Sequence, residues 1–131
     1  MERSRKYIRV QKPVRPKFDD IAKRGFLRQT QKKIDSSKKL KQKVSRIAMK
    51  GNRVYLYQLV EQFQPEGKVY LTPLIDGKYL EFPFARITIN DARAEYCTAD
   101  WQRHNERWIS LFEGTFQVCL KEIDDDKTWF Q

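Results

Sequence analysis

The sequence predicts an α+β fold, in which a basic N-terminal arm and helix precede a small, mostly antiparallel sheet of about four to five strands with one covering helix. Three observations lead to this prediction. Positive charge is concentrated before residue 51, runs of aromatic and β-branched residues follow it, and one later segment has the apolar period of a helix. A chain of 131 residues is expected to form one domain.

Charge divides the chain after Lys50. Residues 1–50 contain 18 of the 27 Lys and Arg but only 4 of the 17 Asp and Glu, a net charge of +14. Residues 51–131 contain the other 9 basic and 13 acidic residues, a net charge of −4, and the whole chain carries +10. Because like charges at this density repel one another and a polyanion relieves that repulsion, the N-terminal part predicts a polyanionic partner.

Composition divides the chain into an extended basic arm, a basic helical segment and an α+β body: 1–18, 19–50 and 51–131. Pro13 and Pro16 exclude a helix from the arm. Asp19 and Asp20 are typical N-cap and first-turn residues of the helix that follows. Gly51 is typical of a left-handed helix C-cap, so the helical segment is expected to end there.

The helical pattern is clearest over residues 30–50. Four apolar residues share one stripe of that helix: Ile34, Leu40, Val44 and Ile47. Ser36 and Ser37 interrupt the pattern, so a break or a second N-cap is expected there. The stripe either packs on the body or becomes ordered only when a partner binds.

The body is expected to begin with strands. Residues 54–60 and 68–75 have the composition of strands, and Asp76-Gly77 is the signature of a tight hairpin. A third strand is predicted over 79–84, with a continuation over 86–89.

The C-terminal part predicts one helix and one strand. Residues 92–99 are ambiguous between the two. Asp100 is a typical N-cap, and a helix is predicted over 100–113. Its apolar face would cover the sheet through four residues: Trp101, Trp108, Leu111 and Phe112. The clean alternation of residues 115–120 predicts a final strand.

Phosphate binding is the chemistry that the basic part favours, because Lys and Arg that neutralise phosphates supply most of the affinity for nucleic acids. The sequence therefore predicts non-enzymatic nucleic-acid binding, to DNA or RNA, with the body adding shape or a surface for a protein partner. The expected contact residues lie in the arm and the helical segment: Arg3, Arg5, Lys6, Arg9, Lys32, Lys33, Lys38, Lys39, Lys41, Lys43 and Arg46. An alternative is a protein-interaction subunit that docks on an acidic partner or a nucleoprotein complex.

Aromatic residues on the predicted strands offer a second surface: Tyr55, Tyr57, Tyr70, Tyr79, Phe82 and Phe84. They could form a stacking platform for unpaired bases. Because alternate residues of a strand point to opposite faces, half of them must face the core, and core packing is the favoured interpretation. Tyr55 and Tyr57 are expected to share one face. The chain has no RNP1-type run, so a standard RNA-recognition motif is not predicted.

A small metal-independent ribonuclease is the enzymatic alternative. His104 with Arg103, Arg107, Arg86 and Tyr96 could supply proton transfer and stabilise phosphate charge. Small basic bacterial toxins that cleave mRNA also place N-terminal helices before a sheet, which is an analogy of element order alone. The chain contains no motif that would strengthen it, so an enzyme is not the favoured prediction.

Neither a cofactor nor a metal site is predicted, because the chain has one His, no Cys-x-x-Cys pair and no EF-hand spacing. Cys97 and Cys119 are interpreted as reduced thiols, which favours a cytoplasmic location. No apolar run approaches a membrane span. The acidic run 124–126 is expected to form a solvated turn, or to dock on the basic helix and compete with nucleic acid.

Overall fold

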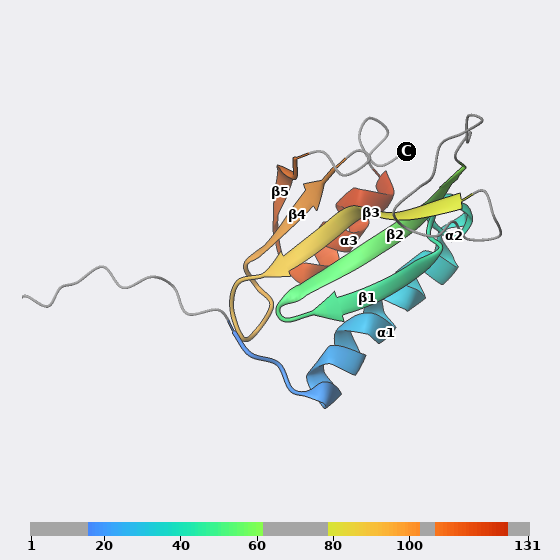
Figure 1. Ribbon diagram of the computed structural model, residues 1–131. Helices are drawn as coiled ribbons and strands as arrows, with labels where there is room; N and C mark the ends of the chain where they lie inside the picture. Colours follow the sequence, from blue (N-terminus) through green and yellow to red (C-terminus); the bar gives the residue numbers. More distant parts are fainter. Residues whose placement is uncertain (1–15, 62–78, 103–106, 126–131) are drawn as a thin grey trace, which may run out of the picture.

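The computed structural model describes residues 16–61, 79–102 and 107–125 (Figure 1). Along the chain, the described part contains three helices and five strands: α1 (Asp20–Ser36), α2 (Lys38–Lys43), β1 (Arg46–Lys50), β2 (Arg53–Glu61), β3 (Tyr79–Ile89), β4 (Cys97–Trp101), β5 (Ile109–Gly114) and α3 (Phe116–Asp125). The strands form one antiparallel sheet in the order β1-β2-β3-β4-β5. The predicted α+β class and strand number are confirmed.

The helices cover one face of the sheet. α1 packs on β1, α3 packs on β3, β4 and β5, and the two helices also contact each other (Figure 1). Between them and the sheet lies a core of alternate strand residues and one stripe of each helix: Ile34, Leu40, Val54, Leu56, Phe84, Ala85, Ile87, Ile89, Cys97, Ala99, Phe116, Cys119, Leu120 and Ile123. The apolar stripe of the basic segment therefore packs on the body, since Ile34 and Leu40 are buried in this core.

The N-terminal helices begin where local capping predicts. The carboxylate of Asp19 accepts a hydrogen bond from the Ala22 amide at 2.8 Å and caps α1. Ser37 separates α1 from α2, and its hydroxyl accepts a hydrogen bond from the Leu40 amide at 3.2 Å. The predicted second N-cap is thus confirmed at Ser37.

The prediction of a helix as far as Lys50 is wrong, because α2 ends at Lys43 and residues 46–50 form β1. Lys50 pairs with Arg53 across a two-residue turn in which Gly51 has a φ of 60°. Positive φ at Gly51 suits a helix C-cap and the first central position of a type II′ hairpin equally well. The ladder with β2 selects the hairpin.

The last two elements were predicted as a helix followed by a strand, whereas the structure has a strand followed by a helix. The helix predicted over 100–113 is wrong: residues 100–101 end β4, residues 109–113 belong to β5, and these two segments pair with each other as strands. The strand predicted over 115–120 is also wrong, because α3 begins at Phe116. Phe116, Cys119, Leu120 and Ile123 occupy one buried face of α3, and this i, i+3, i+4, i+7 spacing is helical.

Other predicted features lie outside the described residues. They are most of the extended arm, the strand over 68–75 and the hairpin at 76–77.

Candidate nucleic-acid interface

The described site residues predicted from the sequence follow one path along α1, α2 and β1. Lys32 is exposed on α1, and Lys38 and Lys41 are exposed on α2. Lys39 and Lys43 are half-buried on α2, and Arg46 begins β1. The predicted arm residues Arg3, Arg5, Lys6 and Arg9 lie outside the described residues.

Lys33 is bound to a carboxylate of the protein itself. Its Nζ lies 3.3 Å from a carboxylate oxygen of Asp124 at the C-terminal end of α3. The other carboxylate oxygen of Asp124 accepts a hydrogen bond from the Ser37 hydroxyl. The acidic run therefore does contact the basic helical segment, through Asp124.

Residues 38–50 form a basic edge, the name used below for α2, the two residues after it, and β1. This segment contains six cations and no carboxylate: Lys38, Lys39, Lys41, Lys43, Arg46 and Lys50. β1 is the first strand in the sheet order, so Arg46 and Lys50 lie at one edge of the sheet, and the other four cations lie on α2, which directly precedes β1 in the chain. Four of them, Lys38, Lys41, Arg46 and Lys50, are exposed.

Two cations of the basic edge rest on aromatic rings. Lys43 Nζ lies 4.7 Å from the centroid of the Phe84 ring, and burial together with the charge of Lys39 lowers the pKa of Lys43. Arg46 stacks over Tyr57 with its Cζ 3.9 Å from the ring centroid. The Nε of Arg46 donates a hydrogen bond to Glu81 at 2.6 Å, which raises the pKa of Arg46.

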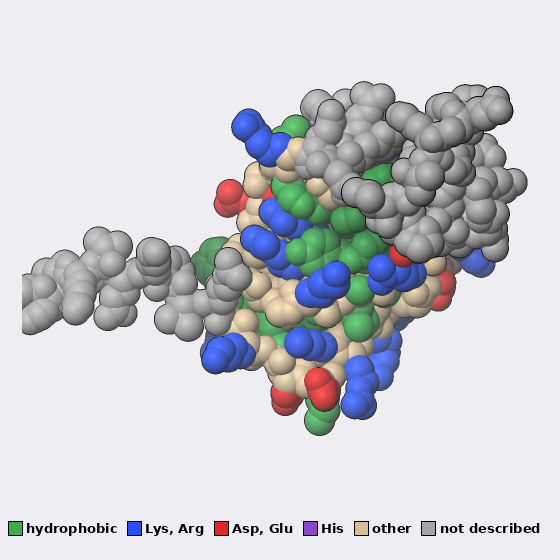
Figure 2. All heavy atoms as spheres, viewed as in Figure 1, with side chains coloured by type: hydrophobic (Ala, Val, Ile, Leu, Met, Phe, Trp, Pro, Cys, Tyr) green, Lys and Arg blue, Asp and Glu red, His purple; other side chains and the backbone are tan. Residues whose placement is uncertain are grey.

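The face of the sheet opposite the helices is called the open face here. Cross-strand partners point to the same side of a sheet, and the registers and ring contacts place these polar and aromatic side chains, among others, on this face: Arg46, Lys50, Arg53, Tyr55, Tyr57, Arg86, Thr88, Thr98, Asp100, Trp108, Ser110 and Glu113. Figure 2 shows Lys and Arg side chains around a group of hydrophobic side chains on the face turned toward the viewer. The open face thus continues the basic edge across the sheet.

Aromatic rings and cations alternate on the open face. Tyr55 lies next to Tyr57 and Trp108, with ring centroids 6.4 and 6.1 Å apart. Lys50 Nζ lies 5.8 Å from the Tyr55 ring, and the Arg86 guanidinium lies 4.4 Å from the Trp108 ring. Such contacts are attractive because the ring face carries partial negative charge.

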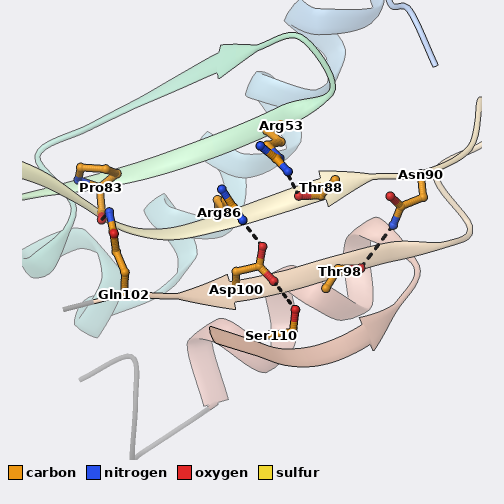
Figure 3. Close-up of polar contacts among 9 residues, drawn as sticks. All are labelled: Arg53, Pro83, Arg86, Thr88, Asn90, Thr98, Asp100, Gln102 and Ser110. Carbon is orange, nitrogen blue, oxygen red and sulfur yellow. Dashed lines mark hydrogen bonds and ion pairs between the residues drawn. The ribbon is translucent and has the colours of Figure 1, made fainter. Parts of the chain in front are cut away.

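Hydrogen bonds hold the arginines of the open face in place (Figure 3). Arg86 Nε donates to Asp100 at 2.6 Å, and the other oxygen of Asp100 accepts from the Ser110 hydroxyl at 2.9 Å. Arg53 Nε donates to the Thr88 hydroxyl at 3.1 Å. These bonds cross from β2 to β3 and from β3 to β4 and β5, so neighbouring strands fix each guanidinium.

The aromatic residues divide between the core and the open face. Phe84 lies in the core, as predicted. Tyr55 and Tyr57 share a face, as predicted, but it is the open face rather than the core face. The sequence contained a signal for this arrangement: Arg53, Tyr55 and Tyr57 alternate on one side of β2, and a core-facing side would not include Arg53.

Sequence reasoning did not include four residues of this surface among the nucleic-acid contacts. They are Lys50, Arg53, Arg86 and Trp108, which the registers and ring contacts bring together. Trp108 was expected on a helix that the structure does not form. No sequence signal groups them, because they come from β1, β2, β3 and the residue before β5, and only the pairing of strands brings them together.

The structure separates two residues of the ribonuclease alternative, Tyr96 and Arg86, and it places the exposed Arg107 next to Trp108, whose ring contacts Arg86. Tyr96 is 71% exposed and precedes Asp100, the cross-strand partner of Arg86, by four positions. At about 3.3 Å per strand residue, Tyr96 is about 13 Å from that pair along the strand. His104 and Arg103 lie outside the described residues.

Metal and thiol chemistry find little support in the described part of the chain. That part contains no group of three or more His, Cys, Asp or Glu that could hold a metal ion. Cys97 and Cys119 are free and buried. Burial raises the pKa of Cys97 to about 12 and that of Cys119 to about 11, so both thiols are protonated at neutral pH.

Comparison of the chain with protein families, with curated proteins and with solved structures finds no match in any of the three. Among the described residues, no helix combines the length and apolar character needed to cross a membrane.

Proposed function

We propose that the protein is a non-enzymatic nucleic-acid-binding protein of the cytoplasm, in which the basic N-terminal arm and the basic edge contact phosphates. The observation that carries the proposal is the basic edge: six cations and no carboxylate in residues 38–50, four of the cations exposed, on α2 and the edge strand β1. A row of cations on ordered elements suits a polyanion because each can approach a separate phosphate.

The proposal predicts a steep dependence on salt. Each phosphate neutralised by a Lys or Arg releases condensed counterions, and the slope of log affinity against log salt is about −0.9 per phosphate on duplex DNA. Titrating labelled duplex and single-stranded oligonucleotides with the full chain at several salt concentrations measures this slope.

A matched pair of variants tests the basic edge. The double variant Lys38→Gln, Lys41→Gln is expected to weaken binding to all sequences alike and to reduce the salt slope by about two units. Lys121→Gln removes an exposed cation from α3, where it pairs with Asp125, and is expected to leave both quantities unchanged. Equal effects of the two changes would refute a specific role for the basic edge.

The two alternatives give different results in the same assays. A complex with a protein that forms through the body and is insensitive to salt would favour the protein-interaction subunit. Cleavage of RNA that is lost in His104→Ala or Arg107→Ala would favour the ribonuclease. The nucleic-acid proposal expects RNA to stay intact.

A further inference from the structure

The open face has the composition of a ligand surface rather than of a core. Its rings include Tyr55 and Trp108, which are half-buried, lie outside the core and contact each other. Exposed aromatic groups rimmed by polar residues mark interaction sites, so these rings indicate a binding surface on the face opposite the helices. The cations around these rings indicate which type of ligand the face would bind.

Charge complementarity indicates an anionic ligand. The open face carries Arg46, Lys50, Arg53 and Arg86, and it adjoins the other lysines of the basic edge. Glu81 and Asp100 each neutralise one of the arginines, and Glu113, the cross-strand partner of Thr98, is an exposed carboxylate at the β5 side of the face. Lys50 and Arg53 therefore leave the β1–β2 side of the face positive, which favours phosphate groups there.

Of the two central arginines, Arg53 is the one suited to a bidentate contact, whereas Arg86 is 15% exposed and paired with Asp100. Arg53 is held through Nε by the Thr88 hydroxyl, and within the described residues its Nη groups donate no hydrogen bond. A guanidinium fixed in this way binds a phosphate with less loss of side-chain entropy than a lysine does. Asp100, held in turn by Ser110, sets the orientation of Arg86.

Ring and guanidinium are adjacent. Tyr55 is the direct cross-strand partner of Arg86, and Arg86 lies over Trp108. Lys50 Nζ lies 5.8 Å from the Tyr55 ring and Arg53 lies on the same side of β2 as Tyr55, so a base stacked on these rings would have its phosphate within reach of these two cations. Bases stack on aromatic rings and on guanidinium planes alike.

A duplex fits this face poorly. Four spacings of about 4.8 Å make a five-stranded sheet about 19 Å wide, whereas the major groove of DNA is about 12 Å wide. The bases of a duplex are also stacked on one another and cannot reach the rings. A single strand can lie flat on the sheet and turn its bases toward it.

We propose that the open face binds unpaired nucleotides, with Tyr55 and Trp108 stacking on a base while Lys50 and Arg53 bind the backbone phosphates and Arg86 supports the Trp108 ring. This inference rests on the proposed function and specifies its ligand as single-stranded RNA or DNA. The basic edge supplies affinity for any nucleic acid, and the open face supplies the preference for a single strand.

The test compares Trp108→Leu with Tyr96→Leu in the full chain. The probes are a labelled oligo-uridine, an oligo-thymidine and a duplex of the same length. Trp108→Leu is expected to weaken binding of the single strands roughly fivefold or more, and to leave the duplex affinity and the salt slope unchanged. Tyr96→Leu removes an exposed aromatic ring that lies about 13 Å along the sheet from the Arg86–Asp100 pair, and it is expected to change nothing. Trp108→Tyr keeps a ring and should restore most of the loss.

The outcomes separate this inference from the proposed function. If the wild-type chain binds nucleic acid but Trp108→Leu binds single strands as Tyr96→Leu does, or loses duplex binding equally, the open-face site is overturned and the proposed function stands. If the wild-type chain binds none of the probes, both are overturned. Weaker binding of only oligo-uridine or only oligo-thymidine supports the site and identifies its ligand as RNA or DNA.

Discussion

Removing the carboxylate of Asp100 is expected to destabilise the protein more than removing any exposed carboxylate. The Asp100 side chain is 5% exposed and that of Arg86 is 15% exposed, so both charges are largely withdrawn from water. Asp100→Ala leaves the guanidinium of Arg86 without its partner and the Ser110 hydroxyl without its acceptor. Breaking a buried pair in this way costs about 3 kcal/mol of the free energy of unfolding.

Two further variants make the measurement specific. Asp100→Asn removes the charge but retains an oxygen for Arg86 Nε and an amide for the Ser110 hydroxyl, so about half the loss is expected. Asp125→Ala breaks the exposed ion pair with Lys121, in which the two side chains are 66% and 53% exposed, and is expected to change stability by no more than about 0.5 kcal/mol.

Urea unfolding followed by circular dichroism measures all three variants against the wild-type chain. A loss of about 3 kcal/mol leaves a domain of ordinary stability folded, so Asp100→Ala can be purified and titrated. The reasoning is refuted if Asp100→Ala and Asp125→Ala are equally stable, because the network across β3, β4 and β5 would then contribute nothing.

Two further predictions concern a turn and a thiol. Gly51→Ala is expected to lower the free energy of unfolding in urea by about 1–2 kcal/mol, because the φ of Gly51 is 60°. Gly25→Ala within α1 is expected to raise it by about 0.5–1 kcal/mol, because nothing lies within 4 Å of the added methyl group. Equal effects of the two variants would contradict this reasoning. Burial raises the pKa of Cys97 to about 12, so from pH 9 upward the native state keeps a proton that the unfolded chain loses, and stability falls as pH rises; Cys97→Ala, measured in reductant at pH 8 and pH 10, should show a smaller fall than the wild-type chain.

Local sequence signals were sufficient for the elements whose neighbouring residues favour a single type of secondary structure. Strands β2 and β3 coincide closely with the predicted strands because aromatic and β-branched residues dominate both. The start of α1 follows from Asp19, whose capping bond depends only on residues of the next turn.

Non-local pairing decided the elements that sequence reasoning assigned wrongly. Residues 100–113 have apolar residues at a spacing that fits a helix, yet Trp101 pairs with Ala85 and Ile109, and Asp100 binds Arg86 instead of capping a helix. Short apolar runs are ambiguous in period, and the neighbouring strand resolves the ambiguity. The hairpin at Gly51 is a second example, because a positive φ at Gly51 is compatible with both a helix C-cap and a hairpin turn.

The division of charge at Lys50, and with it the expectation of a polyanionic partner, came from composition alone, because a net charge does not depend on how the chain folds. Only the tertiary structure decided which cations stand beside which rings. Lys50, Arg53 and Arg86 come from three strands, and they reach Tyr55 and Trp108 through a register that is set by burial of Val54, Leu56 and Ile87 on the other face of the sheet. A shift of one residue would turn every one of these side chains to the opposite face, so the open face depends on the packing of the core.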